Sequence, residues 1–518
     1  MTHREVMEAL SGLLLAMFVA MVSSTIVSNA LPRIVADLEG SQTGYTWVVV
    51  STMLAMTVTT PIWGKLGDLF DNKILVQGSL AIFAAGSLAA GLAQSMEFLI
   101  GARVVQGVGV GGLTALVQVV IAKMVSPRER GRYSGYIGAV FALATVSGPL
   151  IGGVLVDTVG WRWCFYVGVP ISIIAFIVLQ MKLHIRFQRR EASIDYVGSL
   201  LIMAGVSALL IWVSLGGSQF EWASATSFAL LGGSLVVIAL AVVWEGLFAK
   251  EPIIPLRLFG DRTTVLATLA SVLIGVAMFG STVYLSQYFQ MARGMSPTKA
   301  GLMSIFMVGG LFVTSLVSGR LVTKTGRWKR FLTGGMLLVI AGLLLLGLID
   351  AETHLLQVGL SMTLLGLGLG MTMQNLVLAV QNNTANADMG AASSLVTFFR
   401  SIGGSAGVAA LGALLSHRVA DSVLEGFKKL PPEVQAQIGN GSHESHAIPD
   451  LAELPPVIRD IYETAFGGAI GDVFMVGVPF AVLALVCVLL IKEVPLRTSV
   501  MREDELAAAR ATADADAH

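Results

Sequence analysis

The sequence predicts an all-α integral membrane protein. Hydrophobic residues make up 55% of its 518 residues and charged residues only 13%, whereas a soluble domain carries roughly 25% charged residues. The mean hydropathy is +0.78. A membrane-spanning helix needs about 20 mostly apolar residues, and the chain has about fourteen such stretches. Their approximate ranges are 9–31, 45–63, 74–93, 98–122, 133–156, 164–183, 196–215, 224–247, 264–286, 298–319, 331–350, 356–380, 391–415 and 467–491.

Lys and Arg are unevenly distributed between the predicted loops. If the N-terminus is cytoplasmic, most of them fall in inner loops and tails, as the positive-inside rule requires. We therefore expect a multi-pass protein of the inner or plasma membrane, with both termini in the cytoplasm. The first apolar stretch is too long for the core of a typical signal peptide, so we expect an uncleaved helix.

Two basic inner loops divide the predicted helices into groups of six, two and six. We expect an N-terminal six-helix bundle at 1–187, two inserted helices with flanking inner loops at 188–262, and a C-terminal six-helix bundle at 263–491. A long polar outer loop, 416–466, interrupts the second bundle, and a cytoplasmic tail follows at 492–518. Two groups of six indicate an internal repeat.

A short sequence match supports the repeat. The inner loop after the second helix opens with GKL at Gly64, and the inner loop after the tenth opens with GRL at Gly319. Both matches stand at the same point of a six-helix group. The match is short, but its position in the predicted topology favours an internal duplication.

Several classes of function are disfavoured. A formal net charge of zero without a basic tract argues against nucleic-acid binding. The predicted spans hold no histidine pair and no cluster of nucleophiles or carboxylates, so we expect no enzyme. His443 and His446 have the spacing of metal ligands, but no third ligand lies nearby, and we interpret them as part of a solvated loop. We expect no metal site and no cofactor.

Arg103 is the most distinctive polar residue within a predicted helix. An arginine inside the bilayer is costly unless it is paired, so it is a functional candidate by default. It begins the sequence RVVQGVGVGG, whose glycines predict close helix packing.

Other polar or adaptable side chains are candidates to line a central cavity. Those on the first helix share one face, and either helix packing or cavity lining explains them. The amides of the twelfth helix should face a cavity or a partner helix, while the ninth-helix and thirteenth-helix residues are equally open to structural roles. The candidates are Met21, Ser24, Ser28, Tyr284, Gln287, Gln374, Asn375 and Arg400.

The fifth predicted helix combines an internal proline with several glycines. Gly148-Pro149 should bend the helix, because proline removes one backbone hydrogen bond. Gly148, Gly152 and Gly153 leave one flank without side chains, so another helix can approach closely. The stretch ends at Asp157, which is either an ordinary helix-end residue or a functional carboxylate.

Together these features resemble the major facilitator superfamily, specifically its branch of drug:proton antiporters with fourteen helices. Residues 64–73 resemble its signature loop, which implies a cytoplasmic gate in which Asp68 and basic residues form a charge relay. Arg103 resembles the fourth-helix arginine that the family links to proton transfer. The gate residues so implied are Gly64, Lys65, Asp68 and Lys73.

The glycine-rich stretch resembles the antiporter motif of helix five, formed here by Gly148, Pro149, Gly152 and Gly153. The resemblance implies a major facilitator fold with two six-helix pseudo-repeats, and it assigns this stretch to the contact between the halves. One departure matters: Ser23 stands where the first helix of the family usually carries Asp. Asp157 is then the nearest acidic candidate, beside Arg103, for proton coupling.

The resemblance implies a secondary exporter of drugs or other bulky, partly apolar compounds, driven by the proton gradient through alternating access. It would act as a monomer among membrane lipids, with small molecules and protons as partners. An exporter of lipids or cell-envelope precursors is the alternative, motivated by the outer loop 416–466. A membrane enzyme and a non-transporting sensor are less favoured rivals.

Overall fold

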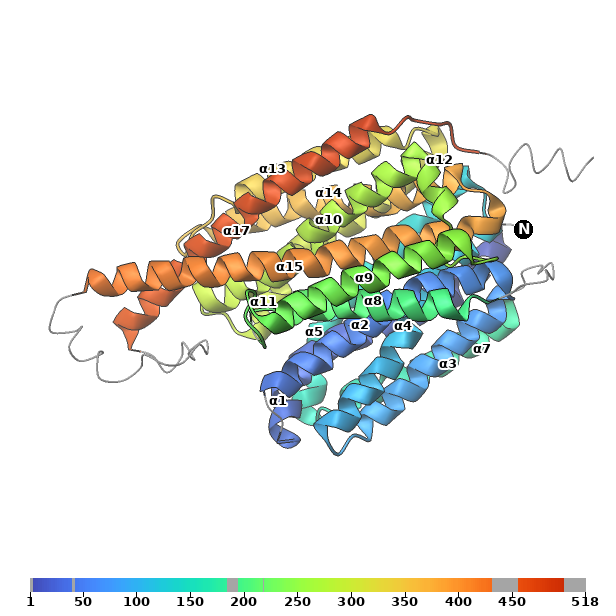
Figure 1. The fold of residues 1–518 in the computed structure, drawn as a ribbon. Coiled ribbons are helices and arrows are strands. Elements are labelled where there is room, and N and C mark those ends of the chain that lie inside the picture. Colours follow the sequence, from blue (N-terminus) through green and yellow to red (C-terminus); the bar gives the residue numbers. More distant parts are fainter. Residues whose placement is uncertain (1–2, 40–41, 184–193, 218, 431–454, 498–518) are drawn as a thin grey trace, which may run out of the picture.

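The computed structural model describes residues 3–39, 42–183, 194–217, 219–430 and 455–497. Within these residues, fourteen helices are long and apolar enough to cross a membrane (Figure 1). The predicted all-α membrane fold is therefore confirmed. We call the end of the bundle that holds the N-terminus, on the right in Figure 1, the inner end, following the predicted orientation.

The first half of the chain contributes α1 (His3–Asp37), α2 (Gln42–Leu69), α3 (Asn72–Gly91), α4 (Met96–Met124), α5 (Pro127–Thr158), α6 (Trp163–Tyr166) and α7 (Gly168–Lys182). The inserted pair is α8 (Tyr196–Leu215) and α9 (Ala225–Leu247), followed by the short helix η1 (Leu256–Gly260). The second half contributes α10 (Arg262–Gln287), η2 (Tyr288–Ala292), α11 (Pro297–Met303), α12 (Ile305–Thr325), α13 (Lys329–Leu346), α14 (Leu355–Asn383), η3 (Asn386–Asp388), α15 (Met389–Lys428) and α17 (Pro456–Leu490).

Helices in the two halves pack in the same pattern. In the first half α1 contacts α5 and α7, while α4 contacts α2 and α3. In the second half α10 contacts α15 and α17, while α14 contacts α12 and α13. Across the halves, α2 packs against α15 and α5 packs against α12. The architecture is thus that of two related six-helix units joined by two equivalent helix crossings.

The inserted helices lie beside the contact between the halves. α8 packs against α9 and also against both α2 and α15. One apolar cluster joins them, with Val58 from α2, Ile202 from α8, Ile253 from the linker after α9 and Phe398 from α15. The inserted pair therefore touches one helix of each half. The predicted domain boundary at residue 187 falls outside the described residues.

The predicted bounds of the long polar loop, 416–466, are wrong at both ends. α15 has 40 residues and continues to Lys428, and α17 already begins at Pro456. At 1.5 Å per residue α15 is about 60 Å long, roughly twice the hydrocarbon thickness of a bilayer. Arg418 of α15 pairs with Asp472 of α17 at 3.4 Å. Polar helical extensions therefore replace much of the expected loop, and His443 and His446 lie outside the described residues.

Candidate functional site

Arg103 is buried at the meeting point of four helices. Its side chain on α4 is 3% exposed, with Nε donating to the Val48 carbonyl of α2 at 3.3 Å and Nη1 donating to Gln106 Oε1 at 2.5 Å. Gln106 Nε2 then donates to Ser23 Oγ of α1 at 3.0 Å and Ser87 Oγ of α3 at 2.8 Å. Ser23, which replaces the usual acid, thus ends a neutral hydrogen-bond chain from the buried cation.

No carboxylate pairs with Arg103 among the side chains that the structure describes. The glycines after it allow α4 to lie very close to its neighbours. A methyl group at Gly107 would lie 2.6 Å from the Thr52 carbonyl oxygen of α2, and one at Gly109 would lie 2.5 Å from the Phe83 nitrogen of α3. Close backbone packing therefore places the guanidinium among backbone and amide acceptors.

The glycine-rich stretch of α5, Gly148 to Gly153, faces a different partner from the one expected. A methyl group at Gly148 would collide with the Thr25 side chain of α1, and one at Gly152 would lie 3.1 Å from the Ile26 carbonyl oxygen. Thr25 Oγ1 also donates to the Ala144 carbonyl of α5 at 3.3 Å. In this structure, assigning Gly148 and Gly152 to the contact between halves is therefore wrong, because they pack within the first half.

Three further parts of that prediction lie outside the structural description. The backbone of α5 includes Pro149, Gly153 and Asp157, but the placement of these residues within it is not described. Asp157 stands in the last turn of the helix, and its part in proton coupling stays a prediction.

The halves meet at the inner end through two glycine pairs. A methyl group at Gly64 of α2 would lie 2.8 Å from the Gly390 carbonyl oxygen of α15, and one at Gly131 of α5 would lie 2.7 Å from the Gly319 carbonyl oxygen of α12. Gly64 and Gly319 are the residues that open the two matching sequence loops. The internal sequence match therefore marks two equivalent crossings, each with backbone against backbone.

Asp68 caps the helix that crosses α2. Its carboxylate accepts hydrogen bonds from the backbone N–H groups of Gly390 at 2.8 Å and Ala391 at 3.0 Å, in the first turn of α15. An anion at a helix N-terminus is stabilised by the unpaired amides and the helix dipole. Asp68 therefore holds the second half to the first by charge-assisted hydrogen bonds.

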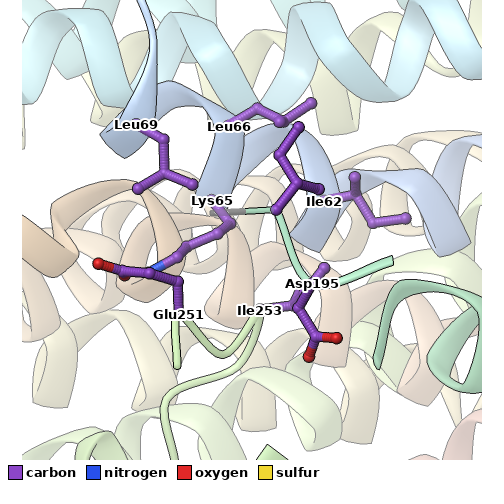
Figure 2. A pocket seen from close by; sticks show the side chains of 8 residues that line it. Ile62, Lys65, Leu66, Leu69, Asp195, Glu251 and Ile253 are labelled. Carbon is purple, nitrogen blue, oxygen red and sulfur yellow. The ribbon is translucent and has the colours of Figure 1, made fainter. Parts of the chain in front are cut away.

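The basic residues of the signature loop contact groups other than Asp68. Lys65 forms an ion pair with Glu251 in the linker after α9, with Nζ and Oε2 2.7 Å apart (Figure 2). Lys73 Nζ donates to the Gln180 carbonyl of α7 at 2.7 Å. The implied direct relay between these lysines and Asp68 is thus not formed by hydrogen bonds in this structure.

Sequence reasoning missed several residues near this inner contact between the halves. Lys123 Nζ donates to the Gly67 carbonyl at 2.5 Å, close to Asp68. Arg130 of α5 is 1% exposed and donates to Gln381 Oε1 of α14 at 3.2 Å. The signal available in the sequence was only that Lys123 and Arg130 flank a short inner loop, which the positive-inside rule already explains.

The predicted cavity residues stand in different surroundings, and their assignment to a substrate cavity stays a prediction. Tyr284 is 3% exposed, and its hydroxyl donates to the Val408 carbonyl, so it joins α10 to α15. Asn375 is 3% exposed, and its Nδ2 donates within its own helix to the Met371 carbonyl at 2.7 Å.

Gln374 forms a hydrogen bond across the halves: its Oε1 accepts from Gln118 Nε2 of α4 at 3.2 Å. Met21 and Ser24 are half-buried, and the side chain of Ser28 is outside the description.

Arg400 is buried and Gln287 is half-buried, and each has one buried polar atom without a hydrogen-bond partner. Arg400 is 8% exposed, and its Nη1 lacks a hydrogen-bond partner, as does Gln287 Oε1. Gly275 on α10 lies against the Arg400 backbone. Arg400 of α15 thus contacts α10 through its backbone, and its assignment to the substrate cavity stays a prediction.

Comparison with known proteins agrees with this architecture. Residues 13–408 match the Major Facilitator Superfamily. An uncharacterised MFS-type transporter of Mycobacterium tuberculosis is 37% identical over 490 residues, covering 94% of this chain and 69% of the relative. The multidrug transporter protein MdtP of Bacillus subtilis is 33% identical over 506 residues, covering 94% of this chain and 93% of the relative. Efflux pump dotC of Dothistroma septosporum is 34% identical over 502 residues, covering 95% and 85%.

Solved structures show the same fold. The proton:xylose symporter XylE superposes with a TM-score of 0.63 at 13% identity, covering 98% of this chain and 100% of the symporter. The human organic anion transporter MFSD10 superposes with a TM-score of 0.61 at 12% identity, covering 92% and 99%. Sequence, fold and paired inner crossings agree, and the chain belongs to the major facilitator superfamily of membrane transporters.

Proposed function

We propose that this transporter is a secondary active exporter that exchanges protons for drugs or other bulky, partly apolar compounds. Relatives named as a multidrug transporter and an efflux pump support export. The observation that carries the proposal is the pair of glycine crossings at the inner end. Two related units that close against each other on one side are what alternating access requires.

Proton coupling would act on carboxylates and on Arg103. Protonation of Asp68 would remove the negative charge from the N-terminus of α15 and weaken the two hydrogen bonds that hold the crossing. Asp157 would bind and release the transported proton, with Arg103 as the permanently charged partner of this exchange, because the first helix has Ser23 instead of an acid. The energy source would be the proton gradient, and the working unit a monomer in the lipid bilayer.

Flux measurements in proteoliposomes test this function. Transport of ethidium, a cationic dye, and of chloramphenicol, a neutral antibiotic, is measured with and without an imposed pH gradient. We expect flux of at least one compound to depend on the gradient. Flux that ignores the gradient would contradict proton coupling, and the absence of flux for a broad set of compounds would contradict export of drugs.

A variant separates the proton site from the substrate site. We expect Asp157→Asn to abolish gradient-driven flux while ethidium still binds, because the asparagine cannot carry a proton. Binding is measured by fluorescence polarisation on the same protein. Unchanged flux in this variant would remove Asp157 from the coupling mechanism.

A further inference from the structure

The linker between α9 and α10 crosses the inner end next to the contact between α2 and α15. We propose that residues 250–260 form a strap that holds this inner gate closed from both sides, with Glu251 and Arg257 as its positioning residues. The inference rests on the proposed transport cycle, because a strap has a role only if the gate opens and closes.

The first attachment point is on α2. Glu251 pairs with Lys65 at 2.7 Å (Figure 2). Their side chains are 19% and 6% exposed, respectively. Lys65 directly follows Gly64, which meets Gly390 of α15 at the crossing. Because the pair is largely buried, salt screens it little, and loss of one partner leaves a buried charge without this counterion.

The second attachment point is at the start of α15. Arg257 in η1 pairs with Asp388 at 2.7 Å, and Asp388 immediately precedes α15. The Arg257 side chain is 70% exposed, whereas that of Asp388 is 8% exposed. Since the guanidinium is in solvent, this contact should weaken at high salt. The two ends of the strap therefore grip opposite sides of one crossing with unequal sensitivity to salt.

The linker between these points is folded rather than slack. The Glu245 carboxylate of α9 accepts hydrogen bonds from the backbone N–H groups of Ile253 and Ile254, each at 3.0 Å. Ile253 is 3% exposed and packs in the cluster that contains Val58 of α2 and Phe398 of α15. A movement of α2 away from α15 must therefore break the apolar contact, an ion pair, or both.

Glu251 also protects the cap formed by Asp68. Lys65 and Asp68 are three residues apart on α2, so their side chains lie on the same helix face. While Lys65 is held by Glu251, the Asp68 carboxylate remains bonded to the amides of Gly390 and Ala391. Without Glu251, Lys65 is released to pair with Asp68, which would draw the carboxylate away from α15.

Distance measurements between spin labels test the strap on the full chain in nanodiscs, without relying on transport. Labels are placed at the exposed residues Phe70, after α2, and Arg327, after α12; the native cysteines at 164 and 487 are buried. We expect Glu251→Gln to raise the ratio of long-distance to short-distance populations about tenfold or more. Glu251→Asp should restore most of the closed population, because it keeps the charge.

Salt and a second variant test the other attachment point. Arg257→Gln should raise the ratio of long-distance to short-distance populations about twofold in low salt. Near 1 M salt it should have no effect, because the wild-type contact is already screened there. The Lys65→Gln/Glu251→Gln double variant should open the gate no more than Glu251→Gln alone, because the two residues act as one pair. The matched control is Glu8→Gln, which breaks the Glu8–Lys182 pair within the first half and should leave the distances unchanged.

The outcomes separate the strap from the proposed function. Unchanged distances in both Glu251→Gln and Arg257→Gln would overturn the strap, even if gradient-driven flux persists. If wild-type protein shows no flux with any compound, the proposed function is wrong. The spin-label distances in the variants still test the strap in that case. If Glu251→Gln does not fold, the exposed Arg257→Gln, read at low and high salt, decides the question.

Discussion

At the crossing of α2 with α15, a carboxylate accepts two amide hydrogen bonds, whereas at the equivalent crossing of α5 with α12 a hydroxyl accepts one. Asp68 stands four residues after Gly64, and Thr323 stands four residues after Gly319. Thr323 Oγ1 accepts from the backbone N–H of Arg132, the residue after Gly131, at 3.0 Å.

The two crossings share their backbone packing but differ in charge. A glycine pair determines how closely the two helices approach. The residue that accepts the backbone hydrogen bonds, Asp68 or Thr323, determines how strongly the two helices are held together and whether a proton can weaken that contact. A carboxylate at a helix N-terminus can lose its charge to a proton, whereas a threonine hydroxyl cannot. The comparison indicates that only the crossing of α2 with α15 responds to protonation through its cap.

The largest expected effect comes from filling the crossing itself. Gly390→Ala should reduce transport about tenfold or more, since its methyl group would overlap the Gly64 carbonyl oxygen and overpacking costs about 1–3 kcal/mol. Gly319→Ala should be equally harmful, because the second crossing is equally close. Initial flux in proteoliposomes measures both.

The control for these substitutions is Gly78→Ala on α3, where a methyl group meets no atom within 4 Å. It should transport at the wild-type rate. If Gly319→Ala also transports normally, the two crossings are not mechanically equivalent.

Removing the charge at the first crossing should have the next largest effect. We expect Asp68→Asn to lower the closed:open ratio by about tenfold, since hydrogen bonds to a charged group contribute about 1.5–3 kcal/mol. The same variant should lose the pH dependence of that ratio. Spin-label distances at low and neutral pH provide the measurement, and a pH response that survives in Asp68→Asn would place the proton-sensitive group elsewhere.

Changing the hydrogen bond between Thr323 and Arg132 at the second crossing should have a smaller effect. Thr323→Val removes a neutral hydrogen bond worth about 1 kcal/mol, so the closed:open ratio should fall about fivefold. Thr323→Asp should shift the ratio towards the closed state and slow turnover, because a carboxylate that accepts the Arg132 N–H forms a stronger, charge-assisted hydrogen bond. A more open gate in Thr323→Asp would show that charge at this crossing does not act as it does at Asp68.

The smallest effect on the closed:open ratio is expected from the glycine-rich stretch of α5. Gly148→Ala should lower the thermal stability of the protein, since the methyl group would collide with Thr25 of α1, while leaving the closed:open ratio unchanged. Thermal unfolding followed by intrinsic tryptophan fluorescence, together with spin-label distances, distinguishes these effects. A shifted gate with unchanged stability would return Gly148 to the contact between halves.

The sequence alone was sufficient for the number, order and approximate limits of the spans. Whether a stretch enters a bilayer depends mainly on its own length and composition, so the prediction required no knowledge of partners. The sequence alone also located the GKL and GRL loops, because each follows the second helix of its six-helix group. The sequence-based prediction failed at 416–466, because α15 and α17 continue there with polar residues beyond their apolar segments. An amphipathic helix and a loop have similar composition, so composition alone does not separate them.

Only the tertiary structure decided which groups these elements bring together. Asp68 meets amides more than three hundred residues later in the chain, and Lys65 meets Glu251 across the inserted pair. Gly148, which the sequence analysis placed at the contact between the halves, instead faces α1. A glycine-rich face predicts that another helix packs closely against it but does not identify that helix. The identity of the partner depends on how the fourteen described spans pack together. The stretch around Gly64, near the end of α2, could therefore be located from sequence, while its cap, its crossing and its strap required the fold.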